Sequence, residues 1–243
     1  MNKHAIRPLR QTGFSLIEIM IALVLGLFVL GSILSTFIAS KQTYRQQDAM
    51  SRVQENARFA VNMLSKTIRK AGYRDDANIA RPFDEIFPAA VAPFNVAGRV
   101  VFGTDSTFSL RYEVSGDAWL QNCLGVTTAS NVTETLGVVG GELRCTSGAV
   151  TQPLLSGIQG IYFLYGEDTN ADGYAYADRY VTAATVADWN KVVSVQVELL
   201  LVSEANGIVT PQPYIFKGVS VTPTDRKLYQ VYKQVISLRN LQS

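Results

Sequence analysis

The stretch Gly13-Phe14-Ser15-Leu16-Ile17-Glu18-Ile19-Met20 decides how this chain is organised. It opens an apolar run of about 26 residues that extends to Ala39 and contains a single charge, Glu18. At about 1.5 Å per residue, a helix over this run is about 39 Å long, enough to cross the roughly 30 Å core of a bilayer with some tilt. We therefore predict a transmembrane helix, and the carboxylate inside it is a candidate functional group.

The residues before this run are basic. Residues 1–13 include Lys3, Arg7 and Arg10 and no acidic residue, as in the first part of a secretory signal. No small-residue cleavage pattern follows the apolar run, so the small residue that offers a cleavage site is Gly13. Cleavage there would keep the membrane segment and create a new amine on Phe14.

The basic leader, Gly13 and Phe14-Ser15-Leu16-Ile17-Glu18 together resemble the class III leader of type IV pilins and type II secretion pseudopilins. The resemblance implies that a prepilin peptidase cleaves between Gly13 and Phe14 and methylates the Phe14 amine. It also implies that Glu18 pairs with the Phe14 amine of a neighbouring subunit, which agrees with the need of a buried charge for an opposite charge. The alternative is a plain single-span anchor with a chance glutamate.

The chain beyond the leader lacks histidine, because His4 is its only one. This excludes Ser-His-Asp and Cys-His mechanisms and histidine-containing zinc sites, and we expect no enzymatic activity. Removing the leader leaves 19 Lys and Arg against 20 Asp and Glu, a net charge of −1 in place of +2. No basic excess indicates nucleic-acid binding.

Both cysteines, Cys123 and Cys145, follow the membrane segment. The basic leader favours a cytoplasmic N-terminus and hence a periplasmic location for the rest of the chain. Lys41 and Arg45 on the far side weaken that charge argument, and the family resemblance supports it. An oxidising periplasm favours a Cys123–Cys145 disulfide, which stabilises by about 3 kcal/mol for a loop of this size. Two free buried thiols are the alternative.

From Lys41 to Ala71 the sequence contains neither proline nor glycine. Apolar residues recur there at spacings of three and four, which predicts one buried helical stripe made of Val53, Ala57, Ala60, Leu64, Ile68 and Ala71. Gly72 suits the position after a helix. We expect one helix from about Phe14 to Ala71, with its first half in lipid and its second half against a globular domain.

After Tyr73 the pattern changes to the period of two that is typical of strands. Expected strands are Arg99–Phe102, Thr107–Val114, Gly141–Cys145, Gly157–Tyr165, Val192–Val202 and Gln230–Leu238. We expect an irregular connection over Arg74–Asn95, and a long surface loop between Gly116 and Gly141. The predicted fold class is α+β and pilin-like: a long N-terminal helix packed on an antiparallel β-sheet domain.

Further stretches narrow the resemblance to PilW-type minor pilins, and more distantly to J-type minor pseudopilins of type II secretion. They are Gln54–Ala60, Ile68–Tyr73, Leu164–Gly173 with Asp178–Tyr180, and Asp225–Leu228 with Ile236–Asn240. The region from about Arg74 to Gly157 matches poorly, so we expect the partner-specific surface there. The expected division is a cleaved leader over 1–13, a transmembrane and filament-core helix over 14–39, an amphipathic helix half over 40–73 and a periplasmic β-rich head over 74–243.

The resemblance implies a minor pilin that acts with other minor pilins and a PilY-type tip adhesin to prime filament assembly and to support adhesion or twitching motility. Its other implied partners are the prepilin peptidase, the major pilin and the inner-membrane assembly platform. Its implied location is the inner membrane, as a single-pass protein with a periplasmic head, and then the filament, at its tip. The alternatives are a J-type minor pseudopilin and, as a different class, a membrane-anchored periplasmic binding protein.

One stretch resembles half of a calcium loop. Oxygen-bearing residues alternate in Asp168-x-Asn170-x-Asp172-Gly173, but the closing glutamate of an EF-hand is replaced by Arg179. Our hypothesis is a Ca²⁺ site formed by Asp168, Asn170, Asp172, the Tyr174 carbonyl and Asp178. A metal-free Asx-rich turn is the alternative. For the nearby aromatic residues we expect core and strand packing rather than a ligand platform; they are Tyr162, Phe163, Tyr165, Tyr174, Tyr176 and Tyr180.

Overall fold

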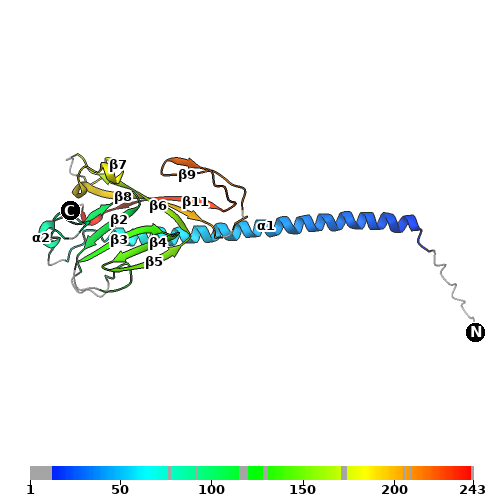
Figure 1. Ribbon diagram of the computed structural model, residues 1–243, viewed down its shortest axis with the longest axis horizontal. Coiled ribbons are helices and arrows are strands. Elements are labelled where there is room, and N and C mark those ends of the chain that lie inside the picture. The colour runs from blue at the N-terminus through cyan, green and yellow to red at the C-terminus, as the bar shows by residue number, and fades with distance from the viewer. Residues whose placement is uncertain are drawn as a thin grey trace, which may run out of the picture. The chain divides into compact units, whose positions relative to one another are not determined.

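The computed structural model describes residues 13–75, 78–90, 92–114, 120–127, 131–170, 174–204, 206–207 and 209–241 (Figure 1). It divides into an N-terminal unit, Met1–Gln47, and a head unit, Asp48–Ser243. The N-terminal unit contributes the first part of the helix α1, and the head unit contains the rest of that helix and all the strands.

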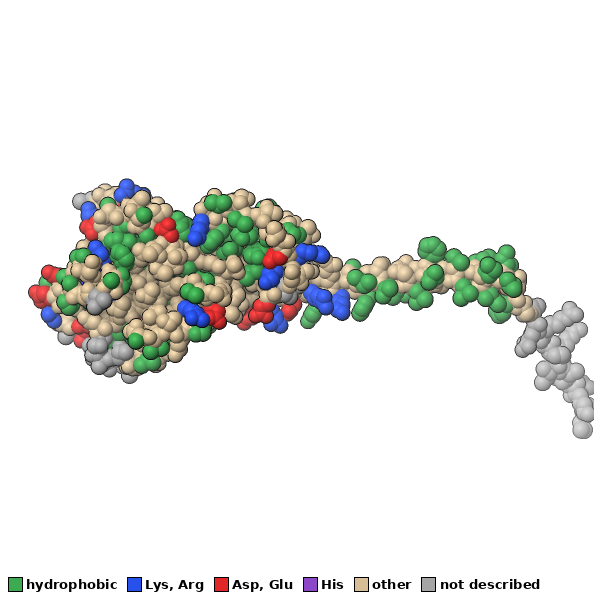
Figure 2. Space-filling model, in the orientation of Figure 1, with side chains coloured by type: hydrophobic (Ala, Val, Ile, Leu, Met, Phe, Trp, Pro, Cys, Tyr) green, Lys and Arg blue, Asp and Glu red, His purple; other side chains and the backbone are tan. Residues whose placement is uncertain are grey.

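Helix α1 extends from Leu16 to Ile68, within the range that the sequence predicts. In the N-terminal unit its apolar side chains are exposed, and Figure 2 shows hydrophobic groups along this part of the helix. By length and composition, α1 can cross a membrane. In the head unit the predicted stripe, from Val53 to Ala71, is buried, because residues three and four apart share one helix face.

The end of α1 is held by the C-terminal segment of the chain. The Asn240 amide donates to the carbonyl oxygens of Arg69 (3.0 Å) and Ala71 (3.1 Å), which satisfies groups that a helix end leaves without partners. The chain then turns at Gly72, whose φ of +71° suits glycine. A Cβ at this position would lie 2.6 Å from Leu241 Cδ2, so any other residue here would also displace the end of that side chain.

The described residues of the head unit form two larger antiparallel sheets and a small hairpin. A five-stranded sheet has the order β1 (Val101–Gly103), β2 (Thr107–Tyr112), β3 (Val132–Val139), β4 (Glu142–Ser147) and β5 (Val150–Ser156). A four-stranded sheet has the order β11 (Tyr229–Ser237), β8 (Val192–Val202), β6 (Ile158–Glu167) and β7 (Arg179–Val181). Strands β9 (Tyr214–Phe216) and β10 (Val219–Val221) form the hairpin. Short helices are α2 (Phe83–Ile86), η2 (Ala183–Thr185), η3 (Trp189–Lys191) and η4 (Arg239–Leu241).

The buried face of α1 and both larger sheets share one hydrophobic core. The helix contributes its apolar stripe, and large side chains such as Phe108, Leu136, Phe163 and Val195 fill the space from the strands. The α+β fold class, a long N-terminal helix followed by an antiparallel β-sheet domain, is therefore confirmed.

The prediction of a long surface loop between Gly116 and Gly141 is wrong over its second half. Residues Val132–Val139 form β3, a central strand of the five-stranded sheet. The alternation is present, but one of its inward positions holds Glu134, which is fully buried. An acidic residue at an inward position makes a strand look polar in the sequence.

The strands β5, β7, β9 and β10 are also absent from the prediction. The last three contain three residues each, too few to show a period. Strand β5 lies at the edge of its sheet, is largely exposed and contains Pro153. Proline is tolerated in an edge strand, because such a strand has a neighbouring strand on one side only.

A buried arginine organises the irregular connection before β1. The Arg111 guanidinium donates to the carbonyl oxygens of Arg99, Pro88, Phe87 and Val96. It also lies against the rings of Phe87 and Phe94. Burial, with a smaller effect of the nearby Arg99 charge, lowers the Arg111 pKa to about 10.

Candidate functional site

The predicted processing site lies at the start of the described residues. Gly13 and Phe14 precede α1 and are exposed, with Phe14 at 79% of its full exposure. Most of the predicted leader, residues 1–12, lies outside the described residues.

Glu18 lies in the first turn of α1 and is exposed. A carboxylate near a helix N-terminus is favoured by the helix dipole. No side chain among the described residues forms an ion pair with Glu18. In an apolar environment its charge therefore needs a partner from outside that part of the chain.

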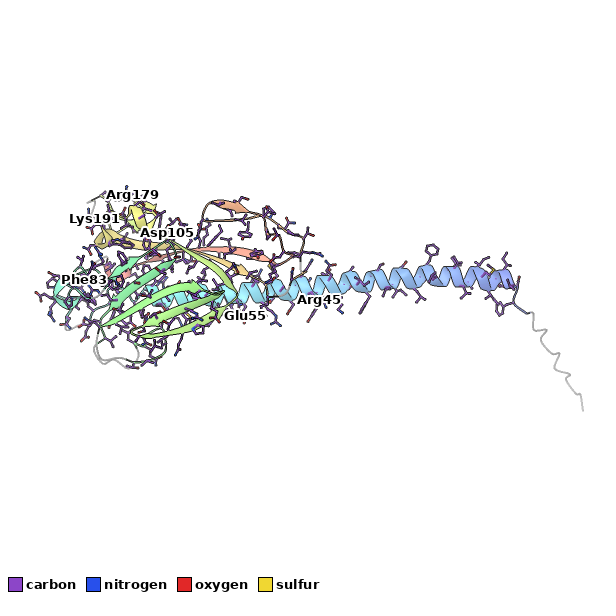
Figure 3. All side chains as sticks on the ribbon, viewed as in Figure 1. Arg45, Glu55, Phe83, Asp105, Arg179 and Lys191 are labelled. Atoms are coloured by element: carbon purple, nitrogen blue, oxygen red, sulfur yellow. A yellow bond between two sulfur atoms is a disulfide. The ribbon has the colours of Figure 1, made fainter. Side chains whose placement is uncertain are left out.

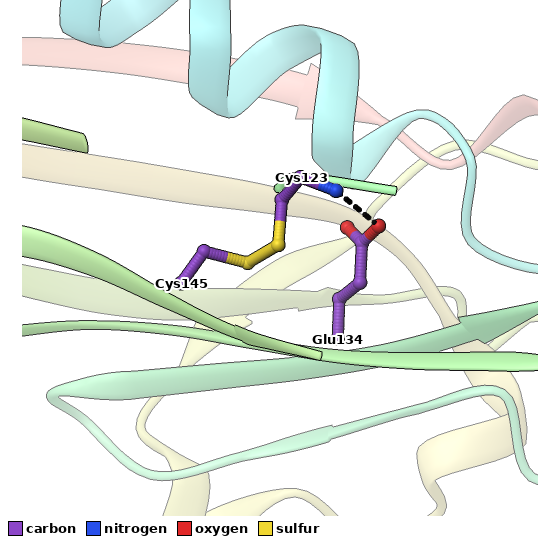
Figure 4. Close-up of side chains that lie close together, drawn as sticks. All are labelled: Cys123, Glu134 and Cys145. Atoms are coloured by element: carbon purple, nitrogen blue, oxygen red, sulfur yellow. Dashed lines mark hydrogen bonds between the residues drawn. A yellow bond between two sulfur atoms is a disulfide. The ribbon is translucent and has the colours of Figure 1, made fainter. Parts of the chain in front are cut away.

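Cys123 and Cys145 form the predicted disulfide, with their Cα atoms 6.3 Å apart (Figure 4). The bond joins the loop before β3 to strand β4, and the Cys145 side chain is buried. If the two cysteines were reduced, their sulfur atoms and the Glu134 carboxylate would lie close enough together to bind a metal ion. Because the two sulfurs are bonded to each other, the arrangement here is structural.

A buried carboxylate lies beside this disulfide. Glu134 Oε1 accepts hydrogen bonds from the Lys70 ammonium (2.8 Å), the Tyr112 hydroxyl (2.6 Å) and the Cys123 backbone N–H (2.8 Å). Lys70 also donates to the Gln121 carbonyl (3.2 Å). Burial lowers the pKa of Lys70, and the Glu134 charge offsets part of that effect. This cluster ties the end of α1, two strands and the disulfide loop together.

The candidate calcium residues lie in the β6–β7 connection. Asp178 Oδ2 accepts from the Thr169 N–H (2.7 Å), the Thr169 hydroxyl (2.9 Å) and the Asn170 N–H (3.1 Å). These bonds lower the pKa of Asp178 and close a turn of the kind that the metal-free alternative describes. Asp168 Oδ1 is buried and has no hydrogen-bond partner among the residues that the structure describes. Asp172 lies outside the described residues, so the five-residue calcium set stays a prediction.

If Ca²⁺ occupies this loop, metal-stripped full-length chain in detergent micelles is expected to gain about 5 °C in melting temperature at saturating Ca²⁺. Asp168→Asn should abolish the gain, because it removes the negative charge of a predicted ligand whose Oδ1 has no hydrogen-bond partner among the described residues. Asp48→Asn, on α1, is the matched control and should keep it. An equal melting temperature with Ca²⁺, with Mg²⁺ and without metal would exclude the site.

The aromatic residues near this loop divide into two groups. Phe163 and Tyr165 are fully buried, as expected for core packing. For Tyr174 and Tyr176 the expectation of core packing is wrong, because they are 66% and 75% exposed. Their rings stack on each other, with centroids 6.2 Å apart, so mutual contact takes the place of core contact.

Two buried tyrosines make the folded chain sensitive to alkali. Burial is the main cause that raises the pKa of Tyr112 and Tyr165 above 10.0, with the charge of Glu134 or Asp105 adding to it. A tyrosine with a raised pKa in the folded state contributes its full stabilisation at a pH below the tyrosine pKa of the unfolded chain. This contribution is lost as the pH rises from the unfolded-state pKa toward the folded-state pKa. The melting temperature should therefore fall steeply above pH 10.

In Tyr165→Phe that fall is expected to be shallower, by up to about 1.4 kcal/mol of unfolding free energy per pH unit, because phenylalanine does not titrate. At neutral pH the variant is expected to have a lower free energy of unfolding than the unaltered chain, since it lacks the hydrogen bonds that the Tyr165 hydroxyl donates to the Thr104 and Thr107 carbonyls. Tyr44→Phe, on an exposed part of α1, is the control that should leave the slope unchanged. Parallel curves for all three chains between pH 10 and 11.5 would contradict this.

Several buried charges escape prediction from the sequence. Besides Glu134 and Arg111, Glu167 is buried at the end of β6 and Glu198 in the middle of β8. Burial opposes the ionisation of Glu167, but hydrogen bonds from Ala187, Arg179 and Asp188 outweigh it and lower its pKa. Lys233, on the neighbouring strand β11, forms an ion pair with Glu198, with its Nζ atom 2.6 Å from Glu198 Oε1. The sequence signal for such a buried charge is a charged residue within an otherwise apolar strand. This signal does not indicate which residue pairs with it.

Comparison with known proteins adds two family matches. Residues 126–240 match the family model of the type IV pilus-assembly protein W, PilW, and residues 8–34 match the prokaryotic N-terminal methylation motif. No curated protein matches the chain. A solved structure of a type IV-like pilin from Thermus thermophilus is similar at 13% identity with a TM-score of 0.47, covering 78% of this chain and 98% of that one.

The two family matches contain part of the residues on which the sequence resemblance rests, since Gln54–Ala60 and Ile68–Tyr73 lie outside both. The methylation motif includes Gly13, Phe14 and Glu18, and the PilW match extends from the disulfide region to Asn240, the cap of α1. This chain is PilW-like over residues 126–240, it carries a prepilin-type N-terminus, and its function is related to the type IV pilus.

Proposed function

We propose that this chain is a minor pilin of a type IV pilus. It joins a complex of minor pilins that primes filament assembly at the inner membrane and carries a PilY-type adhesin at the tip, in support of adhesion or twitching motility. The observation that carries the proposal is the combination of a prepilin-type motif over residues 8–34 with a PilW match over residues 126–240.

The proposed mechanism is assembly and not catalysis. A prepilin peptidase removes residues 1–13 and methylates the Phe14 amine. The Glu18 carboxylate, which forms no ion pair among the described residues, then meets the Phe14 amine of a neighbouring subunit, and the attraction between buried opposite charges sets the axial register. The exposed apolar side chains of α1, which lie in lipid before assembly, pack against other subunits afterwards.

The head presents the lateral surfaces in this proposal. Its interior is fixed by the disulfide and by the buried Lys70–Glu134 pair, so the surfaces that face partners keep a defined shape. The chain is anchored in the inner membrane as a single-pass protein with a periplasmic head before it enters the filament. The region from about Arg74 to Gly157 is the candidate partner surface, and most of it precedes the PilW match.

A cross-linked pull-down from inner membranes tests the proposal. Mass spectrometry would read both the N-terminal peptide of this chain and the proteins recovered with it. We expect a chain that starts at methylated Phe14 and is recovered with minor pilins, the major pilin and a tip adhesin. A chain with Glu18→Val is the matched variant, and it should be processed normally but recovered without these partners.

Other outcomes would overturn the proposal in distinct ways. Recovery of type II secretion components with methylated Phe14 would assign the chain to a pseudopilus as a J-type subunit. A chain that keeps Met1 would exclude both filament assignments and favour a membrane-anchored periplasmic binding protein.

A further inference from the structure

A cleft of about 380 Å³ lies at the end of the head unit where α2 and the C-terminal η4 meet. Its lining is about equally polar and apolar, and the large apolar side chains come from four segments: Phe83 in α2, Val100 before β1, Trp189 in η3 and Leu241 in η4. Figure 3 labels Phe83 at this end of the head. The cleft combines aromatic and aliphatic side chains with polar groups that could orient a ligand.

The walls of the cleft are held in place by the rest of the fold. The Trp189 ring packs against Phe102 and Tyr165, with centroid distances of 4.8 and 4.7 Å. On the opposite side, the Gly98 N–H donates to the Phe87 carbonyl at 2.9 Å and holds the turn beside α2. The aromatic surfaces are therefore preorganised, which reduces the cost of binding.

Two polar side chains, Asp84 and Asn190, also line the cleft. Within the part of the chain that the structure describes, neither the Asp84 carboxylate nor the Asn190 amide forms a side-chain hydrogen bond or ion pair. The neighbouring acid, Glu85, differs because it pairs with Arg81 at 3.3 Å and does not line the cleft. The one formal charge in the lining is thus negative and available to a ligand.

We propose that this cleft binds an arginine side chain presented by a neighbouring protein chain. A guanidinium group is planar, stacks on aromatic rings and donates to a carboxylate through two N–H groups. The cleft supplies both features, with Phe83 and Trp189 as rings and Asp84 as the carboxylate. Within the chain, the Arg74 guanidinium makes a contact of this kind with the Phe83 ring, at 4.3 Å from the ring centroid. The inference does not depend on filament assembly.

The test uses full-length chain in detergent micelles, labelled with 5-fluorotryptophan and observed by fluorine NMR. The chain has two tryptophans, so Trp119→Phe assigns the Trp189 resonance. The probe is N-acetylarginine amide, which is expected to shift this resonance saturably with a dissociation constant of about 1–10 mM, as befits a single side chain. N-acetylcitrulline amide, a neutral analogue of the same shape, is expected to bind about tenfold more weakly because it lacks the charge.

Asp84→Asn should weaken binding of the arginine probe about tenfold, and Glu85→Gln is the matched control that should leave it unchanged. Both residues are exposed, so the two variants are expected to fold alike. Equal shifts with the arginine and citrulline probes, or with N-acetylnorleucine amide, would show an apolar pocket and overturn the proposal. The proposal would also be overturned if the arginine probe gave no saturable shift or if spermidine bound more tightly than this probe. An equal loss of affinity for the arginine probe in Asp84→Asn and Glu85→Gln would overturn it as well.

Discussion

A Gly13→Val chain is expected to keep its leader in cells and to run as a protein 13 residues longer than the processed form. The proposed peptidase cuts after a small residue, and a β-branched side chain at this position would obstruct the scissile bond. Because the Phe14 nitrogen then stays in a peptide bond, no amine forms to pair with Glu18. We expect a nearly complete loss of the mature chain, which a mass-spectrometric reading of the N-terminal peptide would measure.

Thr12→Val is the matched control for this experiment, because it introduces the same side chain one residue earlier. It should be processed almost as the unaltered chain is. If Gly13→Val yielded a methylated Phe14 terminus, or if the unaltered chain retained Met1, the assignment of Gly13 and Phe14 as the processing site would be wrong.

The largest effect on stability is expected at Glu134. Glu134→Gln removes the negative charge opposite Lys70, whose side chain is only 15% exposed, and leaves a buried ammonium without its partner. Breaking such a pair costs about 3–5 kcal/mol, which corresponds to a fall of about 10 °C in melting temperature for a unit of this size. Thermal unfolding of the full chain in detergent micelles, followed by near-ultraviolet circular dichroism, would measure it.

The double variant Lys70→Met with Glu134→Leu tests whether this loss comes from an unpaired charge. An apolar pair avoids the uncompensated charge, so the double variant should be more stable than the sum of the two single changes predicts. Glu142→Gln is the control, because its pair with Arg144 is 35% and 41% exposed and should contribute less than about 1 kcal/mol. Equal losses for Glu134→Gln and Glu142→Gln would show that burial of the Lys70–Glu134 pair adds nothing.

The N-terminal motif, the span of α1 and its buried stripe follow directly from the sequence. Each depends on residues within a few positions of one another, such as the spacing of three and four from Val53 to Ile68. The central strand β8 is likewise predicted with its observed bounds, Val192–Val202, because its apolar run is long and local. The disulfide was favoured on the chemistry of the periplasm, and the structure contains it.

The tertiary structure decided where the charges of the head are buried. Lys70 and Glu134 are 64 residues apart, and Asn240 reaches the carbonyl of Arg69 across 171 residues. A sequence shows that a strand contains an acid, but only the fold brings the ammonium, hydroxyl and N–H donors that make its burial tolerable. For the same reason the sequence predicts a loop where β3 lies, and the cleft between α2, η3 and η4 is visible only in the folded chain. Local periodicity therefore determined the framework of this protein, and long-range hydrogen bonding determined its interior and its clefts.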